Sequence, residues 1–123
     1  MKSIKFANGK EYEIIECYNN GKRYINGETR TCREIVLSAD NIGLDELKEL
    51  LSAESNLSVI DVKMIEDREV DGEMKHLEDT EVLTGFIYAD EIKYNFNGEV
   101  TFVIGEKTEA EKAIDELLIA MEV

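Results

Sequence analysis

Residues 92 to 104 read IKYNFNGEVTFVI, two runs of alternating apolar and polar residues on either side of an Asn-Gly pair. Asn-Gly favours the tight turn that joins two antiparallel strands. The even positions of both runs are apolar, and positions 93, 95, 99 and 101 are polar. We therefore expect a hairpin that turns its even-numbered side chains toward a core and the others toward water.

The first residues repeat this pattern around Asn8-Gly9. A loop with an odd number of residues would place Ile4 and Phe6 on the same face as Tyr12 and Ile14. An even loop would place them with Glu11 and Glu13 instead. Because a one-residue slip moves every side chain to the other face of a strand, the apolar pattern favours the odd loop.

Three more segments are rich in strand-forming residues and two have helical periodicity. The strand candidates are Thr31–Ser38, Leu57–Glu66 and Val82–Ala89. The first helix presents Leu44, Leu47, Leu50 and Leu51 on one side, with Gly43 or Asn41 as its cap. The second begins with the capping box Thr108-Glu109-Ala110-Glu111, and its apolar stripe is Ala110, Ala113, Ile114, Leu117, Leu118 and Met121.

These elements predict one α+β domain over residues 1–123, since a chain of this length closes a single core. We expect a mostly antiparallel or mixed sheet of about six strands with two helices, the second of them C-terminal. The even-numbered strand residues and both helical stripes are expected to gather in that core. The carboxylates are then left on the outside.

The charge of the chain excludes one large class of function. It has 14 basic and 28 acidic residues, a formal net charge of −14. Nucleic acid should be repelled, since a duplex binder needs Lys and Arg to displace phosphate counterions. The simplest interpretation of the charge is solubility. The alternative is an acidic mimic that occupies the surface of a basic partner.

No apolar run approaches the roughly 20 residues of a membrane helix, and the first residues turn at Asn8-Gly9 without a secretory signal. We therefore expect no membrane contact. The expected location is the cytoplasm of the producing cell, with association with a virion as the alternative.

The titratable residues form no recognisable catalytic pattern. Cys17 and Cys32 are too few for a disulfide scaffold, and with the single His76 they lack the paired spacing of a zinc site. Two buried thiols and a solvated histidine are expected. We predict no enzyme, no catalytic residue, no metal site and no cofactor.

One segment has the spacing of a calcium loop. Asp67, Glu69, Asp71, Gly72 and Glu78 follow the twelve-residue pattern with glycine at the sixth position. Glu69 is longer than the usual ligand, Lys75 adds a positive charge, and the flanks alternate like strands. A hairpin turning at Asp71-Gly72 is therefore favoured, and weak calcium binding stays open.

Two segments are candidates for contact with a protein partner. Residues 19–27 contain two Asn-Gly pairs and carry Lys22 and Arg23, with Arg30 and Arg33 nearby, so a projecting loop could insert Tyr24 and Ile25 into a partner. The alternative is an elongated hairpin whose charges balance local acids. The C-terminal residues 117–123 are apolar on more than one side, which fits either a deeply packed helix or a subunit contact.

The order of these pieces resembles small proteins from the virion-assembly regions of phages and prophages of Gram-positive bacteria. The matching pieces are Ile4-Lys5-Phe6-Ala7-Asn8-Gly9-Lys10, Arg33-Glu34-Ile35-Val36-Leu37 before the first helix, Val82-Leu83-Thr84-Gly85-Phe86, and Thr101-Phe102-Val103-Ile104 before the last helix. This resemblance implies a small tail or structural component without catalysis. It implies no functional residue.

The leading hypothesis is therefore a non-catalytic phage-type structural or assembly module that acts through protein contacts, by self-association or with another protein. The alternative is an acidic regulatory or inhibitory protein that binds a basic protein or a nucleic-acid-binding surface.

Overall fold

A computed structural model describes residues 1–121, and in that range the chain forms eight strands and three helices. The strands are β1 (Lys2–Lys5), β2 (Glu11–Ile14), β3 (Glu16–Ile25), β4 (Glu28–Ser38), β5 (Val59–Val70), β6 (Glu73–Thr84), β7 (Tyr88–Tyr94) and β8 (Glu99–Gly105). The helices are α1 (Leu44–Ser52), α2 (Glu54–Leu57) and α3 (Glu109–Met121).

The strands form two four-stranded antiparallel sheets, in the orders β2-β1-β5-β6 and β3-β4-β8-β7. The predicted α+β class and antiparallel pairing are thus confirmed. The strands are divided between two sheets, where the sequence predicted one. The chain changes sheet at Ile15, between β2 and β3, where the Ile15 amide donates to the Val36 carbonyl at 2.7 Å.

The core lies between the two sheets and under α1. Ile4 and Ile60 from one sheet meet Ile35 and Phe102 from the other, and Leu47 of α1 joins them. All five side chains are fully buried. The stripe predicted for α1 is confirmed for Leu47, Leu50 and Leu51, and Gly43 is the N-cap residue.

The predicted register of the first hairpin is confirmed, because Ile4 pairs with Tyr12 across β1 and β2. In the last hairpin Ile92 pairs with Phe102 as expected, but the parity rule is wrong at both ends. Phe96 is fully exposed, and Val103 at an odd position is buried. The hairpin tip extends beyond the core, while β8 lies between β4 and β7 and is covered on its second face.

Two predicted strands have different limits in the structure. The segment expected to run from Val82 to Ala89 is broken at Gly85, whose φ of +79° suits glycine, so β6 ends before it and β7 begins after it. Leu57, expected to start a strand, ends α2 instead.

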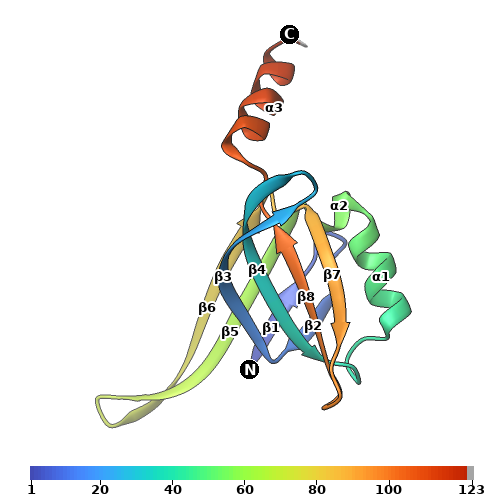
Figure 1. Ribbon diagram of the computed structural model, residues 1–123. Helices are drawn as coiled ribbons and strands as arrows, with labels where there is room; N and C mark the ends of the chain where they lie inside the picture. The colour runs from blue at the N-terminus through green and yellow to red at the C-terminus, as the bar shows by residue number, and fades with distance from the viewer. Residues whose placement is uncertain (122–123) are drawn as a thin grey trace.

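Two elements extend beyond the packed sheets, as Figure 1 shows: the far half of the β5–β6 hairpin at one end, and α3 at the other. Within residues 1–121 no helix is long and apolar enough to cross a membrane.

Candidate protein-interaction site

Helix α3 begins with the capping box that the sequence predicts. The Thr108 amide donates to the Glu111 carboxylate at 2.9 Å, and the Glu111 amide donates to the Thr108 hydroxyl at 3.2 Å. These bonds satisfy two amides that a helix start leaves unpaired. They also fix the direction in which α3 leaves the end of β8.

Arg30 of β4 anchors α3 to the body of the protein. Its side chain is almost completely buried, its guanidinium lies 3.7 Å from the ring centre of Tyr88, and its Nε donates to the Ile25 carbonyl at 2.7 Å. Both terminal nitrogens bind the Glu111 carboxylate, one of them at 3.1 Å. A two-pronged pair with a planar guanidinium fixes orientation as well as position.

The charge of Glu111 is strongly stabilised in this arrangement. Hydrogen bonds from Arg30, with a further one from the Thr108 amide, lower the pKa of Glu111 from 4.5 to about 2. The Tyr88 hydroxyl also donates to this carboxylate at 3.1 Å. Burial and this hydrogen bond raise the pKa of Tyr88. The carboxylate is therefore ionised at neutral pH and bound by three side-chain or backbone groups.

Two further ion pairs join the same side of α3 to the segment that precedes it. Lys107 Nζ lies 2.6 Å from Asp115 Oδ2, and Lys112 Nζ lies 2.5 Å from Glu106 Oε1. Each pair alone contributes little, because it is partly solvated. Together with Arg30 and Glu111 they determine which face of α3 is turned toward the body.

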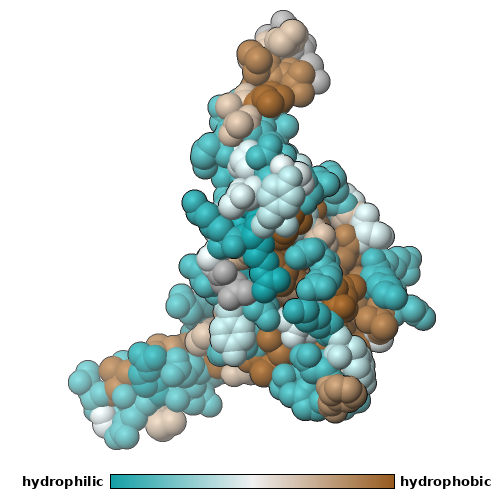
Figure 2. Space-filling model, viewed as in Figure 1, coloured by the Kyte–Doolittle hydropathy of each residue, from teal (hydrophilic) through white to brown (hydrophobic). Residues whose placement is uncertain are grey.

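As a result α3 is oriented with its charged side inward. Its three half-buried residues are Glu111, Lys112 and Asp115, and no residue of α3 is buried. Its large apolar side chains, Ile114, Leu117, Leu118, Ile119 and Met121, are 54–72% exposed. Figure 2 shows this apolar surface as brown atoms on the outer part of α3.

The prediction that the α3 stripe packs into the core is wrong, and so is the alternative of a helix packed deeply against the sheet. The apolar residues do share one side of α3, but the anchoring pairs turn that side away from the sheets. The prediction for residues 122 and 123 falls outside the described residues.

The exposed stripe is a large apolar surface for so small a domain. Complete burial of one Leu, Ile or Met side chain contributes about 1.5–3 kcal/mol. Exposed apolar patches of this kind mark protein or membrane contacts. We therefore define Ala110, Ile114, Leu117, Leu118 and Met121 as the α3 stripe, the candidate interaction site.

The loop predicted to insert Tyr24 and Ile25 is a β3–β4 hairpin turning at Asn26-Gly27, and the prediction is wrong for Ile25. Tyr24 is 75% exposed, but Ile25 is 5% exposed, because it packs with Cys32 and Val103. Ile25 cannot serve as a contact residue.

The basic cluster expected near that loop is also divided. Arg30 is buried under α3, and Arg33 pairs with Glu81 of β6 at 2.5 Å. Both arginines balance acids, as the hairpin alternative predicts, but these acids belong to α3 and β6 and not to the hairpin itself. The anchoring role of Arg30 is missed by sequence reasoning, although Arg30 shares its parity on β4 with Cys32, which indicates that its side chain points inward.

The twelve-residue calcium pattern is part of a long hairpin. Asp71 and Gly72 both have positive φ at the turn, and the first and last residues of the pattern, Asp67 and Glu78, lie on two antiparallel strands and pair with His76 and Ile65. Among the described residues no cluster of three or more metal-binding side chains occurs. His76 is exposed, as predicted, and its Nδ1 lies 2.9 Å from Asp67 Oδ1.

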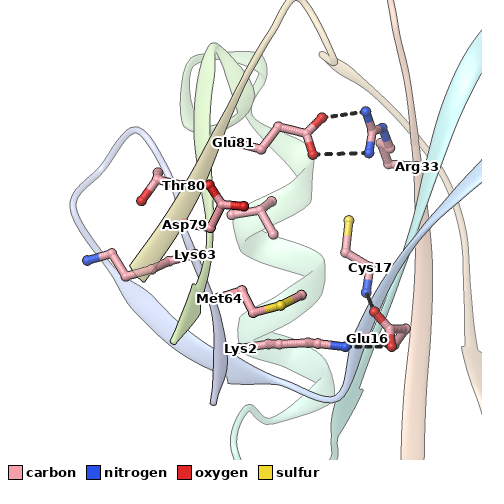
Figure 3. A pocket seen from close by; sticks show the side chains of 10 residues that line it. Lys2, Glu16, Cys17, Arg33, Lys63, Met64, Asp79, Thr80 and Glu81 are labelled. Atoms are coloured by element: carbon pink, nitrogen blue, oxygen red, sulfur yellow. Dashed lines mark hydrogen bonds and ion pairs between the residues drawn. The ribbon is translucent and has the colours of Figure 1, made fainter. Parts of the chain in front are cut away.

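A cavity of about 160 Å³ opens between the edges of the two sheets (Figure 3). Lys2 and Glu81 of one sheet face Glu16 and Arg33 of the other. These four side chains form two ion pairs, Lys2 with Glu16 at 2.6 Å and Arg33 with Glu81. Burial raises the pKa of the Cys17 thiol, which lines the same cavity. The pairs join the sheets, and a charged ligand would have to break them.

Comparison with protein-family models, curated proteins and solved structures finds no match to this chain.

Proposed function

We propose that this protein is a non-catalytic structural or assembly module of the phage type, which acts through protein contacts made by the α3 stripe. The observation that carries the proposal is the orientation of α3. Arg30 and Glu111 hold its charged side against the body, so that its apolar side is available to a partner.

The length of α3 supports the need for a partner. Isolated helices shorter than about 12–15 residues are marginal in water, and most helices in proteins are stabilised by packing of an apolar face. Helix α3 has 13 residues, none of them buried. Its first turn is anchored, whereas residues 116–121 are all exposed. A partner that covers the stripe would supply the missing packing.

The resemblance to phage and prophage virion-assembly proteins supports the same proposal from the sequence. Its pieces run along most of the chain, and the last of them leads directly into α3. The resemblance implies a small structural component, and an exposed apolar surface such as the α3 stripe marks a protein contact.

Co-production tests the proposal. The chain is expressed with the products of its neighbouring genes, purified, and the mass of the complex is measured by light scattering. We expect an assembly larger than a monomer, which Leu117→Glu abolishes and Ile119→Glu preserves. Ile119 is the matched control, because it is equally exposed but lies on the opposite side of α3 from the stripe. The proposal would be overturned if the chain stays monomeric with the product of every neighbouring gene, or if Leu117→Glu leaves the assembly unaffected.

The projecting β5–β6 hairpin supports a second candidate, binding of a basic partner. Residues 66–79 contain seven acidic and two basic residues, and this end of the molecule is mostly hydrophilic in Figure 2. Such binding should weaken steeply with salt. Binding to a basic protein that survives 0.5 M salt, or that is unchanged when Glu69, Asp71 and Glu73 are replaced by Gln, Asn and Gln, would count against it.

A further inference from the structure

The spacing of the α3 stripe fits a second helix of the same kind. Ala110, Ile114, Leu117 and Met121 are separated by four, three and four residues. This is the spacing that places side chains along one seam between two packed helices. Helix α3 has 13 residues, so the seam is about 20 Å long.

The sizes of the side chains distinguish an antiparallel pair from a parallel one. A two-fold axis crossing between Asp115 and Glu116 would bring Ile114 against Leu117 of the second copy. The same axis brings Ala110 against Met121 at each end of the pair. Each small side chain then meets a large one, which fills the seam evenly. A parallel pair would stack alanine on alanine at one end and methionine on methionine at the other.

The charges favour the same arrangement. Glu109, Asp115 and Glu116 project away from the seam. At 100° per residue, each lies 80° or more around the helix from the line that joins Ala110 and Met121. Antiparallel helices also place the two bodies at opposite ends of the pair. A parallel pair would bring two chains of net charge −14 side by side, where they repel.

We propose that the partner of the α3 stripe is a second copy of this chain, bound through an antiparallel α3–α3 contact with two-fold symmetry. This inference rests on the proposed function and specifies its partner. Because Arg30 fixes the orientation of α3, both copies present the stripe already oriented for the contact, which lowers the cost of association.

The contact is small, and its size determines the strength expected. Two such helices bury on the order of 1,000 Å² in total, at the lower limit for a specific interface. We therefore expect a dissociation constant of about 1–100 µM. Higher salt should strengthen the dimer, because it screens the repulsion between the acidic bodies.

Sedimentation equilibrium of the purified chain alone tests the inference. The expected result is a monomer–dimer equilibrium in which Leu117→Glu weakens association by at least about 100-fold and Ile119→Glu changes it by less than about threefold. At a concentration well below the dissociation constant, where all three forms are monomers, they should unfold at the same temperature, since neither side chain belongs to the core.

Crosslinking tests the direction of the helices. Ile114→Cys and Leu117→Cys proteins are mixed and oxidised, and crosslinked peptides are identified by mass spectrometry. Antiparallel packing predicts disulfides between positions 114 and 117 of different copies. Parallel packing predicts disulfides between like positions, and that result would overturn the inference.

The failure of this inference and the failure of the proposed function give different results. A chain that stays monomeric at 1 mM alone, yet forms a Leu117-dependent complex with a neighbouring gene product, overturns the second-copy inference and leaves the proposed function intact. A chain that is monomeric in both experiments overturns both.

Discussion

Arg30 and Glu111 are 81 residues apart in the sequence and are joined by two hydrogen bonds from one guanidinium to one carboxylate. The Arg30 guanidinium also donates to the Ile25 carbonyl and stacks on the Tyr88 ring, and these contacts fix its position. Because Glu111 also caps α3, this one pair connects the end of the sheet to the orientation of the helix. The exposure of the apolar stripe follows from it.

Replacing Glu111 with glutamine should release α3 without unfolding the sheets. The charge that holds Arg30 is lost, and the capping bond to Thr108 is weakened. We expect faster hydrogen exchange in residues 109–121 and unchanged exchange in β4 and β8. Glu109→Gln is the matched control, because the Glu109 side chain is 94% exposed and its carboxylate forms a solvated ion pair with Lys112 Nζ at 3.6 Å. Equal effects of the two substitutions would contradict the anchoring role of Glu111.

The same pair predicts a pH dependence. The pKa of Glu111 is lowered to about 2 in the folded protein. A carboxyl group with a lowered folded pKa contributes stability that is present above its unfolded pKa, near 4.5, and is lost as the pH falls toward 2. The stability advantage of the natural protein over Glu111→Gln should therefore shrink between pH 4.5 and pH 2. Urea unfolding of both proteins across this range measures it, and a constant difference would contradict the assignment.

Truncation of two phenylalanines of the β7–β8 hairpin, Phe102 and Phe96, should reduce the unfolding free energy by very different amounts. Phe102 is fully buried between the sheets, and Phe96 is fully exposed at the tip of the β7–β8 hairpin. Phe102→Ala should cost about 3–5 kcal/mol of unfolding free energy, and Phe96→Ala less than about 0.5 kcal/mol. Urea denaturation measures both. Similar losses of unfolding free energy for the two substitutions would contradict the placement of Phe102 in the core.

Both thiols should react slowly while the protein is folded. Burial raises the pKa of Cys17 and of Cys32, so little thiolate is present at neutral pH. Cys32 is completely buried and should be alkylated more slowly than Cys17, which is half-buried. Mass spectrometry after iodoacetamide treatment at pH 7 gives the order, and urea should remove the difference. A fast Cys32 would contradict the packing of β4.

Calcium should not stabilise the protein specifically. The carboxylates of residues 67–78 are spread along two strands and do not converge. Weak cation binding to an acidic surface depends on charge alone, so millimolar calcium and magnesium should shift the melting temperature equally. A shift specific to calcium, removed by Asp67→Asn, would restore the calcium-loop hypothesis.

Local patterns predicted most of the fold. Asn-Gly turns and parity predicted that even positions face even positions in both hairpins, as the pairs Ile4–Tyr12 and Ile92–Phe102 confirm, and the leucine spacing predicted α1. Parity failed at Phe96 and Val103, because burial there depends on how far a hairpin extends and on what covers its second face. Neither is encoded in alternation alone.

The residues of the candidate site could be predicted from the sequence, but their orientation could not. The apolar stripe and the capping box of α3 are readable from residues 108–121, but which way the stripe faces depends on Arg30. A pair separated by 81 residues has no local signature. Ile25 was misjudged for a related reason, since the residues that bury it, Cys32 and Val103, come from other strands.

The most direct test of the account is hydroxyl-radical footprinting of α3 at concentrations below and above the association range. In dilute solution Leu117 and Met121 should react as exposed side chains, and on concentration they should become protected while Ile119 stays reactive. Protection of Leu117 and Met121 even at the lowest concentration would mean that the stripe packs against its own body, and would contradict the account.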